Sequence, residues 1–172
     1  AVNSAVKIFD KNGNLLLGPT SLNSFLGNGS NNGDPIVLYD QLADRWFVSE
    51  FGAASNSLSI GISVTNDPTG SYYVYDYVHP NGFPDYPHYG LWHDGYYCTV
   101  NIPGYSGNDA LVFEREVMLN GGDNPQMAIF SLPEIVYNPV QVKSPEPANL
   151  LGTTINTDLP GYFTYLQDDA WG

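Results

Sequence analysis

Aspartates are the residues of this sequence best suited to do chemistry. They fall at the ends of apolar runs or in turns, at Asp34, Asp40, Asp44, Asp67, Asp85, Asp94, Asp168 and Asp169. Ca²⁺ prefers oxygen ligands of this kind, and the candidate calcium ligands are Asp34, Asp40, Asp44, Asp85 and Asp94. No Asp-x-Asp-x-Asp-Gly loop of the EF-hand type occurs. Aspartate also caps turns through its own side chain, so a calcium site and turn capping both stay open.

The histidines and the single cysteine give weaker signals. On an extended strand, residues 88 and 93 point to opposite faces, so His88 and His93 are expected to be surface or hydrogen-bonded side chains rather than zinc ligands. Strand alternation places Cys98 on the same face as Tyr96 and Val100, which predicts a buried, inert thiol, with a reactive nucleophile as the alternative. The sequence has no nucleophile elbow, P-loop or dinucleotide fingerprint.

Sugar recognition is a further chemistry that these residue types allow. Tyr86, Tyr89 and Tyr105 are candidate ligand-binding aromatics if they are exposed in loops, and interior packing is the alternative. Asn28 begins an Asn-Gly-Ser glycosylation triplet in a loop expected to be exposed. A sialidase-type site would need a cluster of arginines, and the chain has only Arg45 and Arg115.

The elements that would position these residues come from an internal repeat. The run from 34 to 49 passes from one apolar strand through a turn into a second, and the run from 85 to 99 repeats this order about 50 residues later. A third and a fourth strand follow in each copy, at 58–64 and 72–78, and at 110–113 and 127–132. Four antiparallel strands in about 50 residues are the size of one β-propeller blade.

The repeat predicts an all-β, propeller-like domain over residues 1–172, built from antiparallel four-stranded blades as a partial or open propeller. Residues 1–26 are expected to form the outer half of a blade, with Asn12-Gly13 as its hairpin turn. Residues 34–80 and 84–132 are the two whole blades. Residues 133–172 are a proline-rich connection followed by the start of the next blade.

Composition supports this architecture and narrows the partners. Hydrophobic residues make up 42% of the 172, with 13 Tyr, and the 18 Gly and 13 Pro leave no room for long helices. The formal charge of −13 disfavours nucleic acid and anionic membranes. No apolar run has transmembrane length and no signal peptide is present, which predicts a processed or internal piece of a longer, secreted or cell-surface protein.

Four segments together resemble a group of large secreted bacterial multidomain proteins that contain a propeller-like domain. They are GDPIVLYD at 33–40, DRW at 44–46, SVTNDPTGSYY at 63–73 and FPDYP at 83–87. The resemblance covers most of residues 1–130. It implies an extracellular location and a propeller fold rather than an activity.

These observations predict a non-catalytic extracellular structural, adhesive or protein-interaction module. Sheet edges left open would let it assemble with itself or with neighbouring domains of a larger chain. Glycans are the other partner considered, and calcium is the one cofactor considered. The alternative function is a carbohydrate-binding or glycoside-hydrolase-like propeller of the sialidase type.

Overall fold

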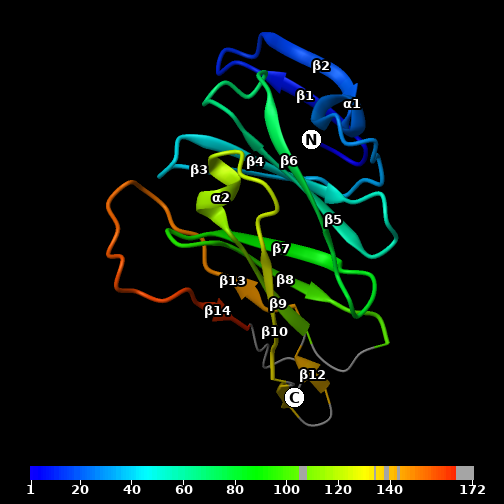
Figure 1. Ribbon diagram of the computed structural model, residues 1–172, viewed down its shortest axis with the longest axis vertical. Coiled ribbons are helices and arrows are strands. Elements are labelled where there is room, and N and C mark those ends of the chain that lie inside the picture. Colours follow the sequence, from blue (N-terminus) through cyan, green and yellow to red (C-terminus); the bar gives the residue numbers. More distant parts are fainter. Residues whose placement is uncertain (105–107, 134, 138–139, 143, 166–172) are drawn as a thin grey trace. The chain divides into compact units, whose positions relative to one another are not determined.

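The fold is all-β and antiparallel (Figure 1), as the sequence predicts. The computed structural model describes residues 1–104, 108–133, 135–137, 140–142 and 144–165. The described strands form separate open sheets and no closed barrel. None of the described helices is long and apolar enough to span a bilayer.

Two four-stranded meanders dominate the structure. The first meander consists of β3 (Ile36–Asp40), β4 (Arg45–Phe51), β5 (Ser57–Ser63) and β6 (Tyr72–Val78), which are neighbours in that order. The second meander consists of β7 (Asp85–Leu91), β8 (Tyr96–Asn101), β9 (Asn108–Phe113) and β10 (Met127–Ser131), in the same consecutive order. The strand positions predicted from the repeat are thereby confirmed to within about two residues.

Burial explains why these strands hold their registers. On β4, Phe47 and Val48 are both buried although they point to opposite faces, and all seven residues of β5 are buried. The first meander is therefore covered on both faces around β5. Gly61 lets Leu26 pack closely there, because a Cβ at this position would lie 2.6 Å from the Leu26 side chain.

An N-terminal hairpin covers part of the first meander. It pairs β1 (Ala5–Phe9) with β2 (Leu15–Ser21), and its predicted Asn12-Gly13 turn is confirmed, with Gly13 at a φ of 87°. The Asp10 carboxylate accepts hydrogen bonds from the backbone amides of Asn12 and Asn14, each at 2.8 Å. A short helix, α1 (Leu22–Leu26), follows and buries Leu22 and Leu26.

Two helices of five residues each were not predicted from the sequence. The first, α1, ends at Gly27, whose φ of 72° gives the left-handed cap that glycine favours. The second is α2 (Arg115–Leu119), in the β9–β10 connection. Single helical turns leave little periodicity in a sequence, so neither helix could be recognised from its residue pattern.

The C-terminal part contains short strand pairs. β11 (Ile135–Tyr137) pairs with β12 (Val140–Val142), and β13 (Glu146–Pro147) pairs with β14 (Phe163–Thr164). The start of a further blade was predicted at the end of residues 133–172, and β14 is a strand in this part of the chain. Its partner lies in the segment predicted to be a plain connection.

The chain forms two compact units. Unit 1 holds residues 1–80 and 117–124, and unit 2 holds residues 81–116 and 125–172. Each unit contains one meander. The prediction of a single propeller-like domain over residues 1–172 stays a prediction.

Candidate functional site

One face of the second meander is half covered by a C-terminal segment, residues 144–165, which we call the strap. Cross-strand pairing places His88, Gly90, Thr99 and Tyr97 on this face of β7 and β8. The strap crosses them, with β13 lying against β7 and β8. The face therefore has a covered half over β7 and β8 and a less covered half over β9 and β10.

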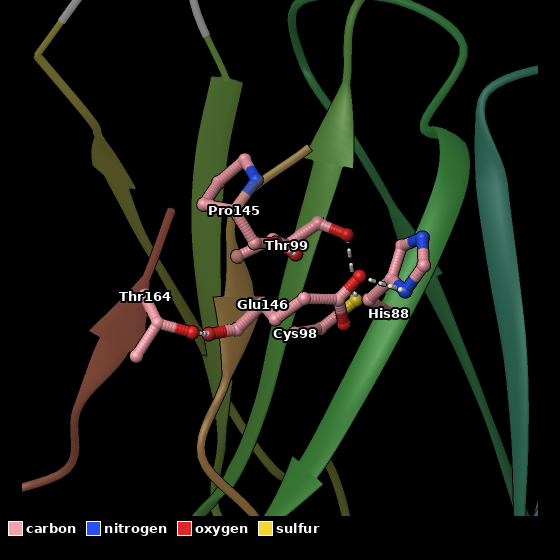
Figure 2. A network of polar contacts seen from close by, with 6 residues as sticks. All are labelled: His88, Cys98, Thr99, Pro145, Glu146 and Thr164. Carbon is pink, nitrogen blue, oxygen red and sulfur yellow. Dashed lines mark hydrogen bonds and ion pairs between the residues drawn. The ribbon is translucent and has the colours of Figure 1, made fainter. Parts of the chain in front are cut away.

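Two polar contacts fix the start of the strap (Figure 2). The buried Thr99 hydroxyl donates a hydrogen bond of 2.5 Å to the Pro145 carbonyl oxygen. Nδ1 of His88 lies 2.8 Å from Oε1 of Glu146, at a site where both side chains stay partly exposed. The Thr164 hydroxyl donates at 3.4 Å to the Glu146 carbonyl oxygen, which ties β14 to β13.

Further along, the strap bonds to the end of β7. The Asn149 side chain accepts from the Leu91 amide at 2.9 Å, and the Leu150 amide donates to the Leu91 carbonyl at 2.9 Å. The indole of Trp92 donates at 3.3 Å to the Leu159 carbonyl oxygen. Nε2 of His93 lies 3.2 Å from the same oxygen.

Gly90 is required by this close packing. A Cβ at Gly90 would lie 2.4 Å from the Ala148 carbonyl oxygen and 3.0 Å from the Pro147 side chain. Contacts below 3.0 Å to a backbone oxygen force the backbone to move, so only glycine lets the strap lie this close to β7.

An apolar groove of about 440 Å³ lies beside the strap, over β9 and β10. Its lining includes Tyr97, Val112, Ala128, Phe130, Gly161 and Phe163. Small side chains on β9 and β10 form its floor, and Phe130 at its rim is 57% exposed. Tyr97 and Phe163 meet edge to face with ring centroids 5.8 Å apart. The groove thus offers aromatic surface to a partner.

The groove carries a charge and adjoins a sheet edge. Asp94 is exposed and is the one carboxylate among its described lining residues, with the Tyr97 hydroxyl donating to it at 3.3 Å. β10 is an outer strand of its sheet. The Gln126 carbonyl accepts a hydrogen bond from the Glu114 amide, and the Leu132 amide donates to the Asn108 carbonyl. By the alternation of an antiparallel pair, the backbone groups of Met127, Ile129 and Ser131 therefore point away from β9.

A smaller cavity of about 230 Å³ lies between the N-terminal hairpin and the first meander. Its walls are apolar and include Val6, Ile8, Val37, Trp46, Val48 and Tyr72. Phe25 of α1 closes against Tyr72, with ring centroids 4.9 Å apart. Among the described residues that line this space, Lys7 has the one charged side chain and Ala1 is the N-terminal residue, so most of its surface is apolar.

Glu50 is a buried residue at the centre of a polar cluster in unit 1 that sequence reasoning missed. Glu50, Ser59 and Asp76 are directly opposite one another on β4, β5 and β6. The Asn28 amide donates to Glu50 at 3.2 Å and to Ser59 at 3.0 Å, and the Ser59 hydroxyl donates to Asp76. Burial raises the pKa of Glu50, while the bonds from Asn28 and from backbone amides oppose this rise.

This cluster is built to hold a loop rather than a cation. The groups that donate hydrogen bonds to Glu50 are N–H groups of the Asn28 side chain and of the Asn32 and Gly33 backbone. Asn28 therefore fastens the loop before β3 to the sheet. Glycosylation of Asn28 would modify the nitrogen that makes these two bonds, and glycosylation stays a prediction.

The predicted calcium ligands are not brought together. Among the described residues, which include all five, no three acidic, histidine or cysteine side chains form a group that could hold a metal ion. Asp40 caps its own turn, accepting from the Leu42 and Ala43 amides at 3.1 Å. Asp44 accepts from Tyr39 and Asn66, which lowers its pKa. Asp34, Asp85 and Asp94 are exposed.

The predicted ligand-binding tyrosines have different environments. Tyr86 is exposed and contacts His88 edge to face, with centroids 4.5 Å apart. Tyr89 is only 8% exposed, so the expectation that it lies exposed in a loop is wrong. Its position in β7 directs it to the face opposite Gly90, with its ring 6.4 Å from Phe113. Tyr105, like Asp168 and Asp169, lies outside the described residues.

The contacts of Cys98 and of the two arginines are structural. Cys98 is fully buried and burial raises the pKa of its thiol, which removes it as a nucleophile at neutral pH. Arg45 donates to the carbonyls of Ala43 and Asp44 at 3.1 and 2.9 Å. Arg115 lies over the Tyr96 ring at 5.8 Å.

The groove residues were also missed by sequence reasoning, although a signal existed. Ala128 and Phe130 alternate along β10 on the face that lacks large partners on β9. That signal has meaning only once the register between β9 and β10 is known. No family model, curated protein or solved structure matches the chain, so its function is argued from this geometry.

Proposed function

We propose that the chain is a non-catalytic protein-interaction module of a structural or adhesive kind. The observation that carries this proposal is the half-covered face of the second meander, where an aromatic groove adjoins the outer edge of β10. Exposed apolar surface rimmed by polar groups is typical of protein-binding sites, and an outer strand can accept another strand.

The polar groups around the groove support binding rather than turnover. A glycoside hydrolase of the usual kind needs two carboxyl groups on either side of the bond that it breaks. Asp94 is the one carboxylate among the described residues that line the groove. His93 contacts a strap carbonyl and the Cys98 thiol is buried.

The two meanders support a propeller-like arrangement as part of the same proposal. They have the same strand order and lie about 50 residues apart in sequence, which is the pattern of successive blades. An extracellular or cell-surface location is proposed from the resemblance to secreted bacterial proteins and from the acidic composition.

A second candidate is carbohydrate binding at the same groove. Aromatic ring faces come from Tyr97, Phe130 and Phe163, and the Asp94 carboxylate can accept hydrogen bonds from sugar hydroxyl groups. These are the groups with which proteins hold sugar rings.

Photo-crosslinking tests the leading proposal. We would replace Phe130 with a benzophenone amino acid. In a matched control, the same amino acid would replace Leu151, which is exposed on the strap away from the groove lining. Protein adducts are expected from position 130 in the native source and not from position 151. Equal adducts at both positions, or binding and hydrolysis of glycans in a parallel screen, would overturn the proposal.

A further inference from the structure

We infer that the partner at the outer edge of β10 is the β10 strand of a second copy of this chain, paired antiparallel about a two-fold axis at Ile129. This inference rests on the proposed interaction function and names its partner. The pairing joins the second meanders of two copies into one continuous sheet.

Of the four outer strands of the two meanders, β10 is the least protected against pairing. Natural sheet edges are usually blocked by charged residues, prolines or bulges. β3 and β6 each contain an aspartate, and β7 contains Asp85, Pro87 and a register shift. β10 has the sequence Met-Ala-Ile-Phe-Ser with none of these features, and its register with β9 is regular.

The outward backbone groups of β10 are complementary to themselves. They belong to Met127, Ile129 and Ser131, the first, third and fifth residues of the strand. With the axis at Ile129, Met127 of one copy lies opposite Ser131 of the other, and Ile129 lies opposite Ile129. Each of these three pairs exchanges two hydrogen bonds. The next outward positions are Pro125 and Pro133, which have no N–H and end the pairing.

The side chains on the groove face also match under this axis. Phe130 lies opposite Ala128 of the second copy, in a pair without hydrogen bonds, where side chains approach most closely. Phe130 is 57% exposed and Ala128 is exposed in the single chain. The pairing therefore sets a large apolar side chain against a small one, and it does so twice in each dimer.

Charge distinguishes this edge in a chain of net charge −13. Like charges directly opposite each other destabilise a strand pair, and β10 has no charged residue. Glu114 lies near the Met127 end of β10, because it follows Phe113, which pairs with Met127. The axis places the Met127 ends of the two copies about 14 Å apart along the strands. This separation exceeds the screening length of about 8 Å at 0.15 M salt.

The size of the contact predicts a weak dimer. About six hydrogen bonds, at roughly one per 100–200 Å², are typical of an interface of about 600–1,200 Å². Specific interfaces of this size are weak and transient. Because both copies use the same surface, association stops at the dimer.

Sedimentation velocity of the full chain, from about 1 μM to about 1 mM, tests this inference. We expect an equilibrium between monomer and dimer. Ser131→Pro removes an outward N–H, and with it two hydrogen bonds of the dimer but none between β10 and β9. Dimerisation should weaken by at least about tenfold. The matched control Ser131→Ala keeps this N–H and should associate like the wild type.

Cysteine pairing tests the register. Met127→Cys and Ser131→Cys each add one thiol to β10, and the native Cys98 is buried. The Cα atoms of a hydrogen-bonded antiparallel pair are about 5.5 Å apart, which a disulfide can span. An oxidised mixture of the two variants should therefore form the mixed disulfide dimer. Each variant alone should crosslink no more than Leu151→Cys, an exposed position away from β10.

The outcomes separate the inference from the proposed interaction function. A wild-type chain that stays monomeric, equal association of Ser131→Pro and Ser131→Ala, or Ser131→Cys that crosslinks alone as well as in the mixture would overturn the inference. If Ser131→Pro lowers the melting temperature, the cysteine variants decide, because they keep every N–H. Photo-adducts from position 130 with a different protein overturn self-pairing and leave the interaction function standing, whereas no protein adduct overturns both.

Discussion

Glu50 shows how one residue can couple the stability of this chain to pH. The residue is 2% exposed, and the pKa of its carboxyl is raised above the ordinary value of 4.5, chiefly by burial and further by the nearby Asp76. When the pH rises, the unfolded chain loses this proton before the folded chain does. The contribution of Glu50 to stability is therefore complete below pH 4.5 and is lost as the pH passes its folded pKa.

Glu50→Gln should therefore stabilise the protein at pH 7 by about 1 kcal/mol, and the gain should vanish near pH 4. Glutamine keeps an oxygen for the Asn28 amide and removes the cost of burying a charge. Urea unfolding at both pH values measures the difference. The exposed Glu116→Gln serves as the control, and an equal gain from both variants would contradict the prediction.

Gly90 is the residue whose replacement should have the most local effect. Gly90→Ala places a methyl group against the Ala148 carbonyl, and we expect a loss of about 1–3 kcal/mol in the free energy of unfolding. Hydrogen exchange should accelerate in residues 144–150 and stay unchanged in β4 and β5. Unchanged exchange in the strap would show that the strap does not need this close approach.

The residue types were informative where the chemistry is local. The turn at Asn12-Gly13, the capping role of Asp40 and the buried Cys98 could all be predicted, because each depends on neighbours a few positions away. Glu50 could not, because its partner Asn28 is 22 residues away and reaches it only after the sheet has formed.

At the scale of elements, the strap depends on hydrogen bonds that contribute unequally to its stability. Thr99 is buried where it donates to Pro145, whereas Glu146 is 54% exposed where it meets His88. A buried hydrogen bond costs more to lose than an exposed ion pair, since solvent screens the pair.

Thr99→Val should cost about 1–3 kcal/mol, the penalty for leaving a buried carbonyl without its donor. Glu146→Gln should cost less than about 1 kcal/mol. Thermal unfolding with limited proteolysis of the strap compares the two. A larger loss from Glu146→Gln would mean that the ion pair, rather than the buried bond, holds the strap.

The sequence could reveal the elements that have a repeated side-chain pattern, and not those held mainly by backbone hydrogen bonds. The strands of both meanders were located because the same order of apolar strands and turns recurs after about 50 residues. The strap was taken for a plain connection, since it bonds mainly through backbone groups such as the carbonyls of Pro145 and Leu159. Backbone groups are the same in every residue, so they leave no mark on the sequence.

At the scale of the whole molecule, net charge should govern association. A formal charge of −13 on each copy sets up repulsion that reaches about 30 Å at 0.01 M salt and about 8 Å at 0.15 M. Association is therefore expected to strengthen between these two ionic strengths, because salt screens the long-range repulsion more than it weakens apolar contact. Light scattering at both salt concentrations would measure the degree of association. Dissociation at the higher concentration would contradict the prediction and indicate that ion pairs dominate the contact.

The order of contacts along the strap also has a mechanical consequence. From its far end inward, the strap is attached at Phe163, then at Leu159, then at Leu150 and finally at Pro145. Because β14 pairs with β13 near the start of the strap, a tension applied beyond β14 must first break this pair and then loads the attachments at Leu159, Leu150 and Pro145 in turn. The strap should peel away at low force, exposing β7 and β8 in steps while the four-stranded sheet beneath stays intact.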